Sequence, residues 1–202
     1  MTITFGLMIV IALVTFAGGQ LPDLQQRLML NPYKAFHHKQ LYRLLSSGFV
    51  HNNRWHLFLN LFTLYFYGQA IEKRFNYEFE ASGTVFYLLL FLSAIVVANL
   101  TTLIKHRNNP NYNSLGASGG VSALILSFIL FDPFQDLCIT REICLPGYAL
   151  GLLFILYSII MSRRGKDNVN HDAHLMGAVY GVVFTLIARP GTLETFIEVL
   201  FH

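Results

Sequence analysis

Four polar side chains stand out because they lie inside, or at the edge of, long apolar stretches: His56, Asn60, Ser118 and His174. A polar group in hydrocarbon is costly, so residues of this kind are candidates for function. A serine hydroxyl becomes a strong nucleophile when a base accepts its proton, and a neutral imidazole is the usual base. Ser118 and a histidine therefore predict acyl-transfer chemistry.

The same residues could stabilise the tetrahedral intermediate of such an attack. Loss of one hydrogen-bond donor to the oxyanion typically costs about 10²–10³ in rate. Asn60 offers an amide N–H and His56 an imidazole N–H, and their spacing of i and i+4 places both on one helix face. The backbone N–H of Ser118 lies at the start of a predicted helix, where the helix dipole adds positive potential.

Each of these residues alone has an ordinary explanation. A serine in a glycine-rich run such as Gly116–Gly120 is more often a packing or capping residue. A lone histidine could be an interfacial side chain, and Asn60 could hold two helices together. The joint arrangement favours the catalytic interpretation.

The elements that must position these residues are apolar helices. Charged residues make up only 12% of the 202 residues, about half the usual fraction in soluble proteins. Six stretches carry no Asp, Glu, Lys or Arg: 1–22, 55–71, 81–104, 108–131, 143–162 and 173–188. About 20 apolar residues cross a bilayer, with about 17 as a minimum. The sequence therefore predicts an all-α, multi-pass membrane protein with six spans.

We expect a single domain over residues 1–202. Its predicted spans are 5–17, 56–71, 83–104, 118–131, 147–161 and 173–188. The connection between the first two spans is long and partly amphipathic, so we expect it to lie partly in the membrane interface. The net charge of +3, without a basic stripe, does not indicate a nucleic-acid partner.

Topology brings the candidates together. The loops that precede the second, fourth and sixth spans lie on one side of the membrane, so His56, Ser118 and His174 share a similar depth. Gly177 and Gly181 form a small-residue pair on the sixth span, and Gly116 and Gly120 repeat that spacing near the fourth. Such pairs let two helices approach closely in lipid, which would bring Ser118 near His174.

The pattern resembles the rhomboid family of intramembrane serine proteases. The shared features are Gly116-Ala117-Ser118-Gly119, His51 followed by His56 and Asn60, Ala173-His174 with Gly177, Glu72-Lys73-Arg74, and Tyr42-Arg43. These matches run from about residue 42 to residue 181. One feature departs from the family: Ser122 stands where many rhomboids have an aromatic residue beneath the catalytic histidine.

The resemblance implies a serine endopeptidase with a dyad of Ser118 as nucleophile and His174 as general base. It also implies an oxyanion hole of His56, Asn60 and the Ser118 amide, with supporting roles for His51, Gly116, Gly119, Gly177 and Gly181. The expected partners are transmembrane protein substrates and the lipid bilayer. We expect no cofactor, metal or nucleic acid.

Two further expectations concern alternatives and orientation. A catalytically weak or inactive rhomboid-like protein that binds membrane clients is the alternative function. Ten of the 14 Lys and Arg residues lie on the same side as the candidates, and the positive-inside rule places that side in the cytoplasm. The resemblance implies the non-cytoplasmic side of a bacterial-type cell membrane, and this is the expectation adopted from the sequence.

Overall fold

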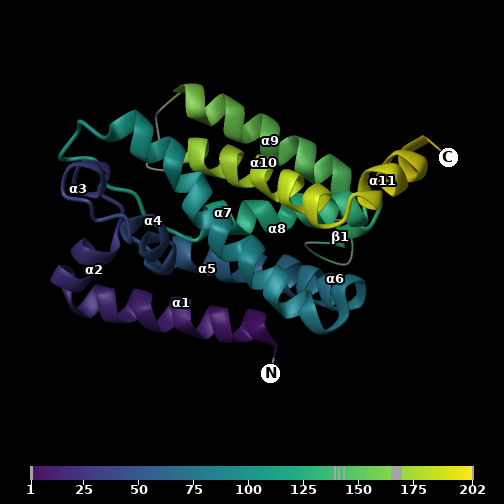
Figure 1. Cartoon of the computed structure of the whole chain (residues 1–202), viewed down its shortest axis with the longest axis horizontal. Helices are drawn as coiled ribbons and strands as arrows, with labels where there is room; N and C mark the ends of the chain where they lie inside the picture. The colour runs from purple at the N-terminus through teal and green to yellow at the C-terminus, as the bar shows by residue number, and fades with distance from the viewer. Residues whose placement is uncertain (1, 139, 141, 143, 165–169, 202) are drawn as a thin grey trace.

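The computed structural model describes residues 2–138, 140, 142, 144–164 and 170–201, which form a bundle of helices with one short hairpin (Figure 1). In chain order the elements are α1 (Ile3–Gln20), α2 (Pro22–Leu28), α3 (Pro32–His37), α4 (Arg43–Ser46), the 3₁₀ turn η1 (Ser47–Phe49), α5 (Arg54–Thr63), the π-helical η2 (Leu64–Gly68), α6 (Gln69–Phe79), the 3₁₀ turn η3 (Glu80–Ser82), α7 (Gly83–His106), α8 (Ser118–Phe131), β1 (Asp136–Cys138), β2 (Cys144–Pro146), α9 (Gly147–Arg164), α10 (His171–Ala188) and α11 (Gly191–Phe201).

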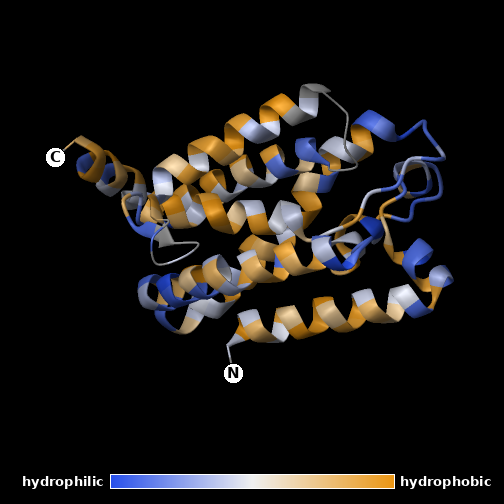
Figure 2. Ribbon diagram, turned by 180° about the vertical axis from the view of Figure 1, so that it is seen from behind, coloured by the Kyte–Doolittle hydropathy of each residue, from blue (hydrophilic) through white to orange (hydrophobic). Residues whose placement is uncertain are grey.

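The all-α membrane bundle predicted from the sequence is confirmed. Three helical stretches among the described residues are long and apolar enough to cross a membrane: α1, the run Arg54–His106 and α10. The run Arg54–His106 makes two passes, because the chain reverses at η3, where Glu80 has a φ of 47°. Apolar residues cover the long helices, whereas hydrophilic residues gather toward their ends (Figure 2).

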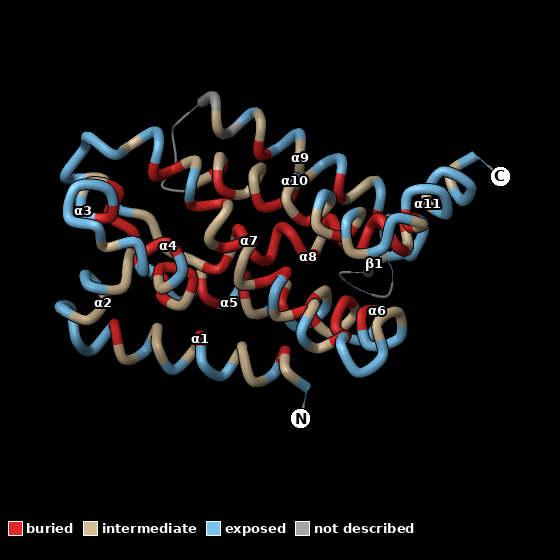
Figure 3. The backbone as a smooth tube through the Cα atoms, in the orientation of Figure 1, coloured by how far each residue is buried: buried red, intermediate tan, exposed pale blue. Residues whose placement is uncertain are grey.

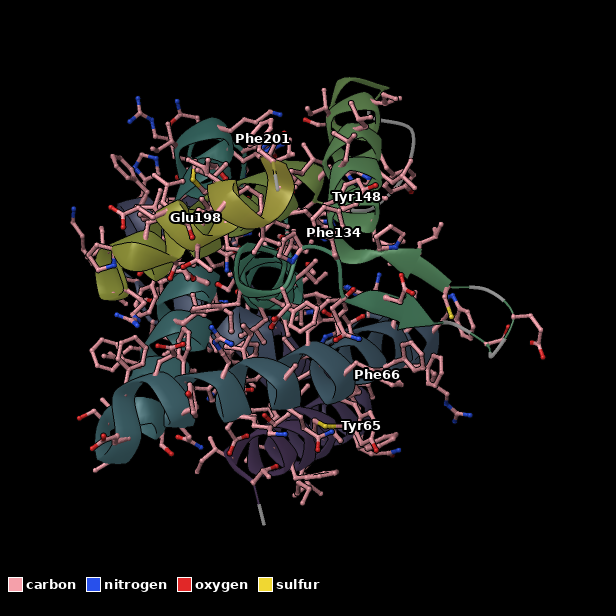
Figure 4. All side chains as sticks on the ribbon, turned by 90° about the vertical axis from the view of Figure 1, so that its right-hand side faces the viewer. Tyr65, Phe66, Phe134, Tyr148, Glu198 and Phe201 are labelled. Atoms are coloured by element: carbon pink, nitrogen blue, oxygen red, sulfur yellow. The ribbon has the colours of Figure 1, made fainter. Side chains whose placement is uncertain are left out.

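The two remaining apolar helices are shorter. Helix α8 has 14 residues, although the charge-free stretch around it begins at residue 108. At 1.5 Å per residue α8 is about 21 Å long, less than the hydrocarbon thickness of about 30 Å. Twelve of its residues are buried, and it runs through the middle of the bundle (Figures 3 and 4). Neighbouring helices, rather than lipid, therefore surround α8.

Helices α8 and α10 touch through glycines. A Cβ atom at Gly177 would lie 2.2 Å from the carbonyl oxygen of Gly119, and one at Gly181 would lie 2.3 Å from that of Ala123. The close approach predicted for Gly177 and Gly181 is therefore present. The partner on α8 differs from the prediction, because Gly120 packs on Phe91 of α7.

This contact gives the first prediction. We expect Gly177→Ala to destabilise the bundle by about 1–3 kcal/mol, as added volume at a packed contact does, because the new methyl group meets backbone that cannot rotate away. Gly6→Ala on α1 is the control, since a Cβ there meets nothing within 4 Å. Thermal unfolding in detergent should show a lower Tm for Gly177→Ala only. Equal Tm values for the two variants would contradict the close contact.

The connection between α1 and α5 is ordered by internal hydrogen bonds. Arg43 is 3% exposed, and its guanidinium donates to the carbonyl oxygens of Gln26 and Met29 at 2.7 Å each. Leu30 pairs with Ser114 in an isolated antiparallel bridge. Leu41 and Leu45 remain exposed, which agrees with the partly interfacial position expected for this loop.

A buried carboxylate fixes α1 at the opposite end of the bundle. Glu72 of α6 is 6% exposed and accepts hydrogen bonds from the backbone N–H groups of Ile3 and Thr4, at 2.8 and 2.9 Å. The hydroxyl of Thr4 also donates to Glu72, at 2.6 Å. A negative charge at a helix N-terminus is favourable, so Glu72 joins the start of α1 to α6.

Candidate active site

Ser118 is the first residue of α8, and Gly116 sets the path of the chain into it. Gly116 has a φ of 121°, a conformation that favours glycine. Its N–H donates to the carbonyl oxygen of Ser47 at 2.9 Å. A Cβ atom at this position would lie 2.6 Å from Cε1 of His56. Glycine at residue 116 therefore lets the start of α8 lie directly against the His56 ring.

A cavity of about 690 Å³ lies where α5, α8 and α10 begin. Ser118, His56 and His174 all line it, together with Gly116 and Gly119. Residues far apart in the sequence thus meet at one hollow. The remaining predicted residues (His51, Asn60, Gly177 and Gly181) are not among those that line it.

The ring of His174 lies against two other rings. Phe154 of α9 is nearly parallel to it, with ring centroids 6.0 Å apart and an interplanar angle of 24°. His171 meets it edge to face at 5.5 Å. The hydroxyl of Ser122 donates to the carbonyl oxygen of Ser118 at 2.7 Å. The aromatic neighbour of His174 is therefore Phe154 on another helix, in a chain that has serine at position 122.

His171 is a second histidine at the start of α10, and it is buried. It is the first residue of α10, is 3% exposed, and also contacts the ring of Tyr157 at 5.4 Å. Asn170 caps this helix, because its side-chain oxygen accepts from the N–H of Ala173 at 3.2 Å. The sixth span was predicted to start at residue 173, whereas α10 starts at His171. The charge of Asp172 ends the apolar stretch but does not end the helix.

Asp172, two residues before His174 on α10, is held by side chains of two other helices. Its carboxylate pairs with Lys105 of α7 at 2.5 Å and accepts a hydrogen bond from Ser162 of α9. These contacts join three helices beside the cavity. The carboxylate of Asp172 is therefore engaged in contacts between helices.

His51 forms a hydrogen bond with the residue that precedes α8. Its Nε2 atom accepts from the N–H of Ala117 at 3.3 Å, so the neutral ring carries its proton on Nδ1. That proton points to the hydroxyl of Thr15 at 3.1 Å, and Thr15 in turn donates to the carbonyl oxygen of Phe49. Burial, and then the nearby His56, lower the pKa of His51 from 6.5 to about 3. The ring is therefore neutral at physiological pH.

The lowered pKa predicts a pH dependence of stability. The unfolded chain binds a proton at His51 below pH 6.5, whereas the folded chain does so only near pH 3. Stability at this residue is complete above pH 6.5 and falls as the pH drops through that window, by up to about 1.4 kcal/mol per unit. We expect Tm to fall less steeply between pH 7 and pH 4 in His51→Gln than in wild type. Identical slopes would contradict the assignment.

His56 and Asn60 lie on one face of α5, as predicted. The Nδ1 atom of His56 is 3.1 Å from the side-chain oxygen of Asn52, and its ring meets that of His51 at 4.9 Å. Asn60 is 6% exposed, and its amide donates to the carbonyl oxygen of His56 at 2.9 Å. The Asn60 amide therefore forms its hydrogen bond within α5 and does not line the cavity, whereas His56 does.

Several cavity residues were not predicted from the sequence. They share a carboxamide side chain and line the cavity: Asn52, Asn53, Asn99, Asn111, Asn113 and Asn170. None of the residues that line the cavity is an Asp, Glu, Lys or Arg. The only sequence signal was the asparagine-rich stretch before α8. These amides make the cavity polar without charge, so water can enter a site that apolar helices surround.

Comparison with known proteins shows the family of the chain. The family model for the Rhomboid domain matches residues 38–191. RHOMBOID-like protein 12, mitochondrial, from Arabidopsis thaliana is 28% identical over 180 residues, covering 82% of this chain and 53% of the relative. Rhomboid-like protein 11, chloroplastic, from the same organism is 32% identical over 151 residues, covering 70% and 50%.

The fold and the site define a polytopic membrane protein with a polar cavity among its helices. The chain belongs to the rhomboid family, which contains intramembrane proteases and inactive relatives. It spans about half the length of the curated relatives that it matches. By name these relatives are mitochondrial or chloroplastic, so they do not favour the bacterial-type membrane expected from the sequence.

Proposed function

We propose that the protein is an intramembrane serine endopeptidase that cleaves transmembrane helices. The observation that carries the proposal is that Ser118 and His174 line one cavity at the starts of two helices in glycine contact. Ser118 attacks the scissile carbonyl, and His174 accepts the hydroxyl proton and passes it to the leaving amine. Water from the polar cavity then hydrolyses the acyl-enzyme, with His174 again as the base.

The oxyanion hole is proposed to consist of the Ser118 amide, His56 and Asn60. The first N–H groups of a helix have no partner within that helix, so the Ser118 amide can donate outward. The amide of Asn60 has two N–H bonds, and one of them already donates to the carbonyl oxygen of His56. The second is the proposed donor, which requires an adjustment when substrate enters.

A substitution on α5 tests this assignment. We expect Asn60→Ala to lower the cleavage rate about 10–100-fold, at or below the usual loss for one oxyanion donor. Thr63→Ala is the matched control, because the Thr63 hydroxyl also bonds to a carbonyl of its own helix, that of Leu59, at 2.8 Å. Initial rates with a transmembrane substrate should fall only for Asn60→Ala. Equal rates in both variants would remove Asn60 from the oxyanion hole.

The proposed substrate is a membrane helix with a segment that unwinds easily. A helix satisfies all of its backbone hydrogen bonds, and its amides must be exposed before hydrolysis. The exposed carboxamides of Asn52, Asn53, Asn111 and Asn113 support this proposal, since amides can pair with the N–H and C=O groups of an unwound segment. The alternative, a client-binding protein without activity, predicts substrate binding without cleavage. A comparison of purified wild type and Ser118→Ala distinguishes the two.

We also propose that the cavity opens on the side where the positive-inside rule places Lys- and Arg-rich loops. The resemblance to the family implies the opposite, non-cytoplasmic side. By the spans predicted from the sequence, ten of the 14 Lys and Arg residues belong to the loops before the second, fourth and sixth spans, and four belong to the other side. Cys144, in the hairpin between α8 and α9, is disulfide-bonded. That hairpin lies at the opposite end from α2–α4 (Figure 1). Disulfides persist in oxidising compartments, so both features support the same orientation.

A fusion at the C-terminus tests the orientation. The chain leaves α10 at the end opposite the cavity, and α11 follows there (Figure 1). In a bacterial host we expect a C-terminal alkaline phosphatase to be active and a C-terminal green fluorescent protein to be dark, since both report export of the tail. The reverse pattern would place the cavity on the exported side.

A further inference from the structure

A surface outside the cavity combines exposed cations with exposed aromatic rings. It is formed by Lys34, Phe36, His37 and Lys39, in and just after α3, and by Arg107, just after α7; we call it the cationic–aromatic surface. The ammonium of Lys39 lies 5.8 Å from the centre of the Phe36 ring, and the guanidinium of Arg107 lies 5.3 Å from the same centre. Two cations from distant parts of the chain therefore share one ring.

These cations have no anionic partner within the described part of the chain. No carboxylate lies within ion-pair distance of Lys34, Lys39 or Arg107 there. The nearby Lys105, in contrast, is paired with Asp172. Two like charges on one ring repel each other, and an anion between them would relieve that repulsion.

The surface is held firmly in place. Ala35 of α3 and Leu103 of α7 belong to the same buried cluster. The side chain of Asn31 caps α3 by accepting from the N–H of Lys34 at 2.8 Å. Lys39 itself has a φ of 58°, a conformation uncommon outside glycine. Packing of α3 against α7 thus sets the backbone positions from which Lys39 and Arg107 extend.

The depth of the surface follows from the length of α7. This helix has 24 residues, so it is about 36 Å long against a hydrocarbon core of about 30 Å. Its last turn carries the basic residues Lys105 and His106, and Arg107 follows directly, so we place this end of the helix at headgroup depth. The exposed Phe36 ring lies beside it, as aromatic side chains often do at the membrane interface.

We propose that the cationic–aromatic surface binds the phosphate headgroup of an anionic phospholipid. The phosphodiester would contact Lys39 and Arg107, and the glycerol and upper acyl chain would pack on Phe36. Charge complementarity supports this occupant, because a cationic surface at headgroup depth faces lipid phosphates at high local concentration. This binding site is separate from the cavity and does not depend on the proposed protease activity.

Thermal unfolding of the purified full-length protein in a neutral detergent tests the proposal. Ligands that bind the folded state raise Tm. The probes are dioleoyl phosphatidylglycerol, dioleoyl phosphatidylcholine and inorganic phosphate at equal concentration. We expect phosphatidylglycerol to raise the Tm of wild type, whereas the other two leave it unchanged. Equal effects of the two lipids would overturn the preference for an anionic headgroup, and an equal effect of inorganic phosphate would overturn a lipid site.

Variants locate the site. Lys39→Gln and Arg107→Gln should each lose at least half of the Tm increase caused by phosphatidylglycerol. Lys73→Gln, an exposed lysine at the other end of the bundle, should keep all of it, and Lys39→Arg should keep most. Because the substituted side chains are exposed, the Tm without lipid should not change. A full lipid response in Lys39→Gln and Arg107→Gln would overturn the site.

Discussion

Ser118→Ala should abolish cleavage of a transmembrane substrate and leave the bundle intact. The substitution removes one hydroxyl group from the first residue of α8, and loss of the nucleophile from a serine–histidine pair typically costs about 10⁶ in rate. The measurement is the initial rate with purified protein in detergent and a substrate whose membrane helix contains a helix-breaking segment with small residues. Equal Tm values for wild type and variant would establish that the fold is unchanged.

Ser122→Ala is the matched control for this experiment. It removes the same group one turn later on the same helix, where the hydroxyl bonds only to the carbonyl oxygen of Ser118 in the described contacts. This variant should cleave at a rate close to that of wild type. If Ser118→Ala retained activity, or if both variants lost it equally, the assignment of the nucleophile would be wrong.

His174→Ala is the second large effect. Without an imidazole the Ser118 hydroxyl keeps its proton, so the rate should fall about as far as in Ser118→Ala. The small residue leaves space beside a cavity of about 690 Å³, so added imidazole should restore part of the rate. Partial rescue would distinguish a missing base from a collapsed site.

The variant His171→Ala tests whether His174, and not the adjacent His171, is the general base. His171 contacts the His174 ring edge to face but is not among the residues that line the cavity. We expect this variant to retain measurable activity that imidazole does not increase. Rescue of His171→Ala by imidazole, with none for His174→Ala, would reverse the two roles.

The helices could be predicted from the sequence because the absence of charge over about 20 residues is a strong physical requirement of the bilayer. The boundaries were less certain. Residues 108–117 carry no charge, yet they form a polar approach to Ser118 rather than helix. Which glycine of α8 faces α10 also depends on where α8 starts. Because α8 starts at Ser118, Gly116 lies outside it, and Gly119 is the residue that contacts Gly177.

The cavity residues also divide into those that the sequence predicts and those that depend on how the helices pack. Ser118, His56 and His174 were predicted because polar groups in apolar spans are rare and costly. Phe154 and His171 were not, because one more aromatic ring in an apolar helix, or one histidine beside charged residues, carries no signal until helices pack. The carboxamides also gather from separate parts of the chain, since Asn99 lies in α7 and the others lie in loops. Asn60 lies on the predicted face, but its bond to the His56 carbonyl depends on local geometry.

The most direct test of the central claim is to locate a covalent serine probe. Purified wild type, His174→Ala and Ser122→Ala are treated with a fluorophosphonate, digested and analysed by mass spectrometry. The proposed dyad predicts an adduct on Ser118 in wild type and Ser122→Ala, and none in His174→Ala. An adduct on another serine, or labelling of Ser118 that does not depend on His174, would contradict the dyad.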